Sequence, residues 1–203
     1  MEAFDLDLGN AGTRTKEQAD RARQLAIDRI CKAGEYVVIF TDGSAFSNPG
    51  PCGAGAVIYW RGITHDSSSY QRPVSKHSNS FHGELQAIDL ALQTVNEAYP
   101  TIRKPVLLLS DCQGALTVTA NPIAPANFTG LYYCIQDRIH TLRAREADIK
   151  LHWIAGHADI AGNEEADVKA KNAALEASGP DFISKEKSWG EAKARVKSKA
   201  LER

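Results

Sequence analysis

Two short apolar runs, each ending in an aspartate, limit what this chain can fold into. The runs "YVVIFTD" (36–42) and "KPVLLLSD" (104–111) are almost continuously apolar and rich in Val, Ile and Leu. Strands with this pattern are buried on both faces, as the central strands of a sheet between two helical layers are. We therefore predict that both runs are central strands, with Asp42 and Asp111 at their carboxyl ends.

The remaining segments predict a mixed sheet with helices on its faces. A Gly/Pro-rich connection at 43–53 leads to strands at 54–60 and 63–72, and short connections of this kind are typical of an antiparallel meander. Helices and strands then alternate, so the expected order after a leading helix is βββαβααβα. The expected helices are 15–33, 80–99, 112–119, 128–146 and 163–177, and the fifth strand is 148–154.

We expect three parts along the 203 residues. Residues 1–34 form an N-terminal extension with a short helix, which "TKEQ" (15–18) would open as a capping box. Residues 35–178 form the main domain, and residues 179–203 form a basic helical tail. The chain has a net charge of −1, whereas its last twenty residues hold seven cationic and three anionic side chains. Such a tail can contact phosphates, and a solvated helix or a linker is the alternative.

Cysteine usage and the N-terminus indicate where the protein works. Cys31, Cys52, Cys112 and Cys134 include no C-x-x-C pair, so zinc-ligand spacing is absent. The start of the chain, "MEAFDLDLGN", has no apolar stretch long enough for a signal peptide or a membrane span. We expect an intracellular protein of nucleus or cytoplasm, not secreted and not bound to membranes, with reduced cysteines.

Two further acids stand out by position. Glu84 precedes Ile88 by four residues and Leu92 by eight, so it lies on the apolar stripe of its helix. Asp167 lies one turn inside a helix for which Asn163 is the expected N-cap. Converging carboxylates repel one another unless a cation neutralises them, and Mg²⁺ prefers oxygen ligands. Two such ions can activate a water molecule and stabilise a leaving oxygen in phosphoryl displacement.

His157 lies in the glycine-containing loop between the last strand and the last helix. An imidazole there can carry a proton near the metal ions. Each candidate also has an ordinary structural explanation: Asp42 as a turn residue, Asp111 as a helix cap, Glu84 and Asp167 as helix acids, and His157 as a loop residue. Only their joint order along the chain favours catalysis.

Four separated motifs together resemble a type 1 ribonuclease H. They are "TDGSAFSNPGPCGAGAVIY", "HGELQAIDLAL", "LLLSDCQGAL" and "HWIAGHADIAGNEEAD", and they span about residues 35–175. The resemblance implies an α/β, ribonuclease H-like fold: a five-stranded mixed sheet, three antiparallel strands and then parallel ones, with helices on both faces. It makes residues 35–178 the ribonuclease H domain.

The resemblance also implies an activity and its residues. The chain would be an endonuclease that hydrolyses the RNA strand of RNA–DNA hybrids with two Mg²⁺ ions, Mn²⁺ being the alternative. The metal ligands would be Asp42, Glu84, Asp111 and Asp167, and His157 would aid proton transfer or product release. Contacts with the hybrid, whose 2′-hydroxyls distinguish RNA from DNA, are expected at Gly43, Ser44, Asn48, Gln113 and Asn163.

Two departures separate the chain from many cellular members of that family. "NSFHGE" (79–84) lacks their Asn pair, and "NPIAPANFTG" (121–130) is short and uncharged where they carry a cationic helix and loop. The "FHGEL" form resembles the ribonuclease H domain of non-long-terminal-repeat retrotransposon polyproteins. The expected partners are therefore an RNA–DNA hybrid and an upstream reverse transcriptase domain, and we expect a monomer. The alternative is a non-catalytic nucleic-acid-binding or interaction module on the same fold.

Overall fold

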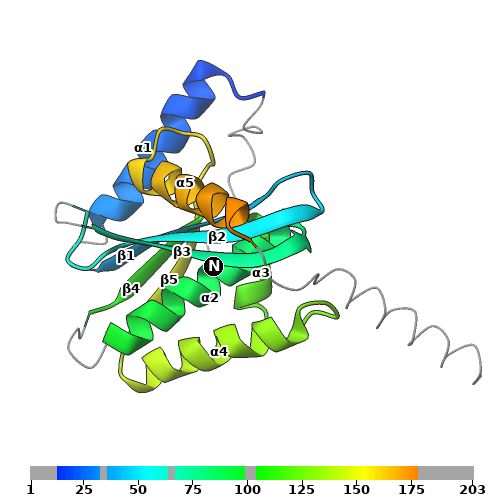
Figure 1. The fold of residues 1–203 in the computed structure, drawn as a ribbon. Coiled ribbons are helices and arrows are strands. Elements are labelled where there is room, and N and C mark those ends of the chain that lie inside the picture. The colour runs from blue at the N-terminus through cyan, green and yellow to red at the C-terminus, as the bar shows by residue number, and fades with distance from the viewer. Residues whose placement is uncertain (1–12, 33–35, 64–66, 99–103, 178–203) are drawn as a thin grey trace, which may run out of the picture.

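The two apolar runs are neighbouring parallel strands at the centre of a five-stranded sheet (Figure 1). The computed structural model describes residues 13–32, 36–63, 67–98 and 104–177. The strands are β1 (Val37–Ala45), β2 (Gly50–Tyr59), β3 (Ser67–Ser78), β4 (Val106–Ser110) and β5 (Ile149–Trp153). The helices are α1 (Lys16–Lys32), α2 (Ser80–Ala98), α3 (Gln113–Ala120), α4 (Thr129–Ala144) and α5 (Ala161–Leu175).

The strand order is β3-β2-β1-β4-β5, with β1, β2 and β3 antiparallel and β1, β4 and β5 parallel. This confirms the predicted mixed sheet. In the β1–β4 register Thr41 pairs with Ser110. The next residues, Asp42 and Asp111, therefore follow one paired position at the carboxyl ends of two adjacent strands, where ligands bind in such sheets.

Both faces of the sheet are covered, as the apolar runs predict. Val37 and Ile39 of β1 belong to a core cluster shared with α2, α3 and α4. Val38 and Phe40 alternate with them and belong to a second cluster shared with α1 and α5. Figure 1 shows α1 and α5 on one side of the sheet and α2, α3 and α4 on the other.

The predicted boundary of β2 was wrong, because its glycines were interpreted as a connection. The strand begins at Gly50. A Cβ atom on Gly53 or Gly55 would overlap the backbone of α5, at Ala174 and Ala166 respectively. These glycines are therefore part of the strand, and they allow α5 to lie directly on it.

The predicted third strand was also displaced. It was expected at 63–72, whereas β3 runs from Ser67 to Ser78 and forms an edge of the sheet. Its serine-rich sequence lacks the apolar pattern of a buried strand. The β2–β3 register shifts on both sides of Cys52, and this irregularity allows Pro73, which has no N–H to donate, in a paired edge strand.

The capping box of α1 is confirmed. The Thr15 N–H donates to Gln18 Oε1 at 3.0 Å, and the Gln18 N–H donates to Thr15 Oγ1 at 3.2 Å. The predicted basic tail, 179–203, lies outside the described residues, as do residues 1–12. Cys52, Cys112 and Cys134 are free thiols. Among the described helices, none combines the length and the apolar character that crossing a membrane requires.

Candidate metal centre

Three of the four predicted acids converge at the carboxyl end of the parallel strands. Asp42, just past the part of β1 that pairs with β4, Glu84 in the first turns of α2 and Asp111 just after β4 each offer an oxygen, and these atoms all lie within 4.8 Å of one another. Asp42 and Glu84 are 9% and 7% exposed. Three elements that are distant in sequence thus hold carboxylates around one point.

Close backbone contacts hold this arrangement. A Cβ atom on Gly43 would overlap the backbone N of Glu84, so the start of α2 rests directly against β1. The Gly43 N–H donates to Asp42 Oδ1 at 2.7 Å. On the other side, a Cβ atom on Gly156 would overlap the Asp111 carboxylate. Gly156 is therefore required by this close approach, and not by a positive φ angle.

The three carboxylates resist ionisation together. Burial raises the pKa of Asp42 to about 8, and the charges of Asp111 and Asp167 add to the shift. Burial, followed by the charges of Asp42 and Asp111, also raises the pKa of Glu84 well above its usual value. Burial raises the pKa of Asp111 as well, against a hydrogen bond from Asn163. A cation at this point would reverse these shifts, because it favours the charged forms.

The donor set fits a hard divalent cation. Among the residues that the structure describes, Glu84 Oε2 is buried and has no hydrogen-bond partner, and a bound ion is one explanation for such an atom. Burial raises the pKa of the nearby Cys52 and Cys112 thiols to about 12. The thiols are therefore not ionised at neutral pH, and the available donors are oxygens, as Mg²⁺ and Mn²⁺ prefer.

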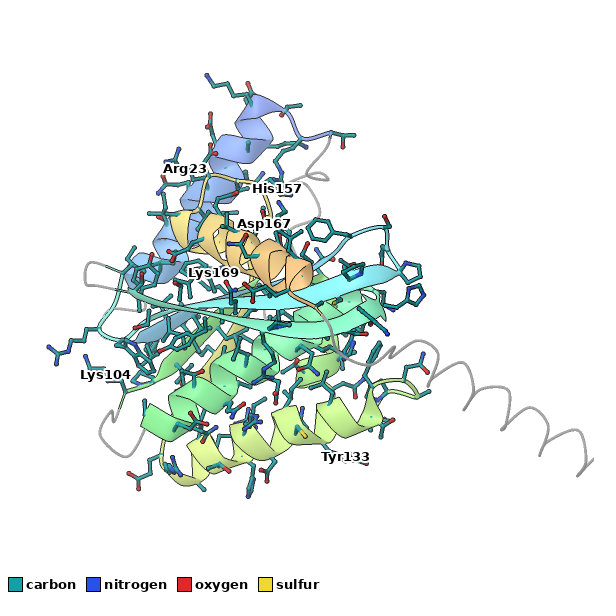
Figure 2. The ribbon with its side chains drawn as sticks, in the orientation of Figure 1. Arg23, Lys104, Tyr133, His157, Asp167 and Lys169 are labelled. Carbon is teal, nitrogen blue, oxygen red and sulfur yellow. The ribbon has the colours of Figure 1, made fainter. Side chains whose placement is uncertain are left out.

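The fourth acid lies at the margin. Asp167 is not among the carboxylates that meet within 4.8 Å, although its charge raises the pKa of Asp42. Its Oδ2 accepts from Lys171 Nζ at 2.5 Å, one helical turn along α5. Figure 2 shows Asp167 on α5, on the side of the sheet that also carries α1.

His157 also lies beside the cluster rather than within it. Its side chain is exposed, and its backbone adopts the left-handed conformation with φ of 52°. Its positive charge lowers the pKa of Asp111, which places the imidazole within electrostatic reach of the cluster. Figure 2 shows His157 in the β5–α5 loop near α1.

The family model described as RNase H matches residues 34–175, well over half of the chain. The chain belongs to the ribonuclease H family. The homology and the acidic triad of Asp42, Glu84 and Asp111 identify an enzyme of the ribonuclease H class.

Individual relatives are distant but well covered. The ribonuclease H of Maricaulis maris is 26% identical in an alignment 152 residues long that covers 70% of this chain and 96% of that protein. The N-terminal RNase H domain of a Mycobacterium tuberculosis protein superposes with a TM-score of 0.55 at 20% identity, over 70% of this chain and 96% of that one. A foamy viral protease-reverse transcriptase in complex with RNA/DNA hybrid superposes with a TM-score of 0.53 at 21% sequence identity. The match covers 70% of this chain and 20% of the viral one. These likenesses confirm the predicted ribonuclease H-like fold.

The predicted substrate-binding residues of this ribonuclease H fall into two groups. Asn48 and Asn163 are held by protein contacts: Asn48 Oδ1 accepts from the Ser80 N–H at 3.1 Å, and Asn163 donates to Asp111. Asn163 was also predicted as the N-cap of α5, which was wrong, since Ile160 holds that position. The other group, Gly43, Ser44 and Gln113, lies next to the acids in sequence, and its contact with a hybrid stays a prediction.

Sequence reasoning missed three residues that shape the site. Trp153 Nε1 donates to the Asp111 backbone carbonyl at 2.9 Å and so fixes the chain at that acid. Lys171 neutralises Asp167, which its position four residues later on one helix could have indicated. Gly156 packs on Asp111, and no local pattern distinguishes this from a turn glycine.

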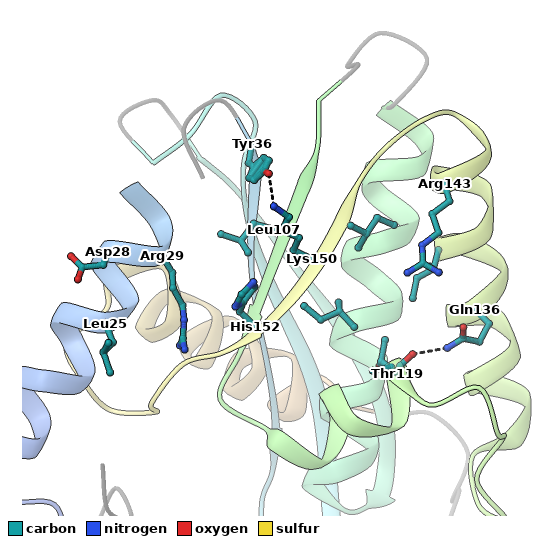
Figure 3. Close-up of a pocket in the computed structure, with 14 residues that line it drawn as sticks. Leu25, Asp28, Arg29, Tyr36, Leu107, Thr119, Gln136, Arg143, Lys150 and His152 are labelled. Carbon is teal, nitrogen blue, oxygen red and sulfur yellow. Dashed lines mark hydrogen bonds between the residues drawn. The ribbon is translucent and has the colours of Figure 1, made fainter. Parts of the chain in front are cut away.

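A cavity of about 770 Å³ lies elsewhere, on the outer edge of β5 between α1 and α4 (Figure 3). Its walls include Arg29, Lys150 and Arg143 but none of the clustered acids. It is therefore not the candidate metal centre.

Proposed function

We propose that this ribonuclease H hydrolyses the RNA strand of RNA–DNA hybrids and uses two Mg²⁺ ions, with Mn²⁺ as a substitute. The observation that carries the proposal is the buried group of Asp42, Glu84 and Asp111, whose oxygens lie within 4.8 Å of one another. Because their pKa values are raised, a bound cation would displace protons from this group and would offset the burial and repulsion that disfavour the charged forms. The structure of the foamy viral relative in complex with RNA/DNA hybrid supports this choice of substrate.

In this proposal the residues have separate tasks. Asp42, Glu84 and Asp111 hold the cations, and Asp167 completes the ligand set from the margin. The cations, when bound, activate the attacking water molecule and stabilise the leaving oxygen. His157 accepts or delivers a proton at the exposed edge of the site. Gly43, Ser44, Asn48, Gln113 and Asn163 line the path of the hybrid.

We further propose that the chain is the ribonuclease H domain of a retrotransposon reverse transcriptase polyprotein. Support comes from the "FHGEL" form around Glu84 and from residues 121–128, which form an uncharged, mostly exposed loop between α3 and α4. Similarity to the foamy viral reverse transcriptase fits this origin, and similarity to the bacterial enzyme fits a free-standing protein equally. A reading frame for a polymerase directly upstream of residue 1 would decide for the polyprotein.

The activity is tested with a labelled RNA–DNA hybrid in Mg²⁺ or Mn²⁺, beside single-stranded RNA and duplex DNA. We expect cleavage of RNA in the hybrid alone, leaving 3′-hydroxyl and 5′-phosphate ends. Asp111→Asn should remove the cleavage, whereas the matched control Asp148→Asn should retain it, because Asp148 is exposed and pairs with Lys150. Hybrid binding without turnover in either metal would favour the alternative, a non-catalytic binding module.

A further inference from the structure

The first helix has no counterpart in the family match, which begins at residue 34. We propose that α1 positions the catalytic His157 loop, with Arg14 and Arg29 as the positioning residues. This inference rests on the proposed function, since it assigns α1 a task in the same reaction. It concerns contacts between residues more than a hundred positions apart in the chain.

Two arginines from this N-terminal segment bind the backbone of the β5–α5 connection. Arg14 Nη1 donates to the Gly156 carbonyl at 2.8 Å, and Arg29 Nη1 donates to the Trp153 carbonyl at 2.7 Å. Both arginines are half-buried. Hydrogen bonds from a charged donor are stronger than neutral ones, and the guanidinium is always charged.

The Gly156 carbonyl is the group that matters for His157. It belongs to the same planar peptide unit as the His157 N–H, so a bond that fixes this carbonyl fixes the plane entering His157. His157 has φ of 52°, a conformation that costs energy in a residue with a Cβ atom and needs support from its surroundings. Arg14 supplies that support from outside the loop.

The Trp153 carbonyl anchors the other end of the connection. The parallel ladder takes the Asp148 carbonyl and the Ile154 N–H towards β4, so the alternate residue Trp153 directs its own carbonyl outwards, to Arg29. Figure 3 shows Arg29 reaching from α1 towards β5. The Trp153 indole in turn donates to the Asp111 carbonyl. Arg29 is therefore linked through one residue to a predicted metal ligand.

Apolar packing joins the same two segments. Ala22, Ala26 and Ile30 of α1 belong to one buried cluster with residues of the loop. Those loop residues are Ile154, Ala155, Ala158 and Ile160. The loop thus buries these apolar side chains in the cluster that it shares with α1 and leaves His157 exposed. The helix holds the loop, and the loop presents the imidazole.

The test compares Arg14→Ala with Arg23→Ala in the full chain. Arg23 is an exposed arginine of α1 (Figure 2) and is the matched control. We expect Arg14→Ala to lower kcat about tenfold with KM for the hybrid changed less than twofold, a loss of about 1.4 kcal/mol in transition-state stabilisation. Arg14→Lys, which keeps a charged donor, should restore part of the rate, and Arg29→Ala should resemble Arg14→Ala.

A double-mutant cycle with His157→Ala shows whether Arg14 acts through the loop. If it does, Arg14→Ala should change the rate less than twofold in the His157→Ala background. A full tenfold loss there, or equal rates for Arg14→Ala and Arg23→Ala, would overturn the inference while the proposed function stands. An inactive wild-type enzyme would instead contradict the proposed function.

Amide hydrogen exchange provides a readout that does not depend on activity. The amides of residues 156–158 should exchange faster in Arg14→Ala than in the wild type or Arg23→Ala, because local opening becomes easier when an anchor is lost. Unchanged exchange in this loop would also overturn the inference, whether or not the hybrid is cleaved.

Discussion

The inner acids and the outer residues of the site are built in different ways. Asp42, Glu84 and Asp111 lie on or directly after elements with residues in the buried core, and close contacts at Gly43 and Gly156 leave them little freedom. Asp167 and His157 lie at the margin, where one has Lys171 as its partner and the other is exposed. The inner group is preorganised and electrostatically strained, while the outer group is adjustable.

This difference separates holding a cation from moving a proton. Buried carboxylates depend most on a cation, because its attraction offsets both their mutual repulsion and the cost of burying their charges. An exposed histidine keeps access to water and can exchange its proton with solvent. The comparison therefore predicts large effects on metal binding and cleavage rate from substitutions of the inner acids, and smaller effects from substitutions of the outer residues.

The largest effect is expected from Glu84→Gln. It keeps the side-chain volume and removes a charge from the inner group, so cleavage of the hybrid should fall about 10³-fold, roughly 4 kcal/mol in transition-state stabilisation. Rates are measured with labelled hybrid at saturating Mg²⁺. If Asp167→Asn lowers the cleavage rate as much as Glu84→Gln does, the distinction between inner and outer acids is wrong.

The next effect concerns stability, pH and metal. The pKa of Asp42 rises from 3.8 to about 8 in the folded protein, so the folded state favours its protonated form. Its contribution to the free energy of unfolding is fully present below about pH 4 and is lost as the pH rises through about 8. Without metal, Asp42→Asn should therefore become more stable than the wild type as the pH rises over this range.

Adding Mg²⁺ should reverse that order at pH 8. A concentration 100 times the Kd stabilises the wild type by about 2.7 kcal/mol, which raises Tm by about 5–10 °C. Asp42→Asn should gain much less. Thermal unfolding followed by circular dichroism, with and without Mg²⁺, measures both effects, and an equal gain in the two proteins would remove Asp42 from the ligand set.

A smaller effect is expected from His157→Ala. Turnover should slow about 100-fold, the lower end of what general acid–base groups contribute. Mg²⁺ affinity measured by calorimetry should stay nearly the same, because the imidazole is not a ligand in this scheme. A large loss of affinity would move His157 into the inner group.

The smallest effect is expected from Lys171→Ala. The Lys171 side chain is 50% exposed, and exposed ion pairs contribute at most about 1 kcal/mol. Its removal frees Asp167 for a cation, so Mg²⁺ affinity should rise by a factor of about 2–5 while Tm hardly changes. Lys169→Ala, on the same helix, is the control. Weaker Mg²⁺ binding in Lys171→Ala would contradict the assignment of Asp167 to the outer ligand set.

Local sequence was sufficient to predict the structure wherever that structure depended on residues of a single helix or strand. The continuous apolar runs ending at Asp42 and Asp111 predicted central strands, because nothing except burial on both faces explains them. Glu84 on an apolar helix stripe predicted a buried carboxylate. The Thr15–Gln18 capping box needed only four residues and is confirmed.

Prediction was wrong or incomplete where the role of a residue depended on contact with an element distant in sequence. Gly53 resembles a turn residue until the backbone of α5 is placed against it. Asn163 resembles an N-cap until Asp111 appears as its acceptor. Arg14 is an ordinary polar residue in sequence, and its bond to Gly156 spans 142 positions. Such contacts depend on the tertiary arrangement, which local pattern does not encode.

The burial of α1 has a practical consequence for anyone expressing this enzyme. A protein shortened to residues 34–175 would keep every predicted catalytic group. It would lose Ala22, Ala26 and Ile30, which cover Val38 and Leu107 in one apolar cluster. A bare apolar face of this kind promotes aggregation, so the shortened protein would precipitate for reasons unrelated to its chemistry.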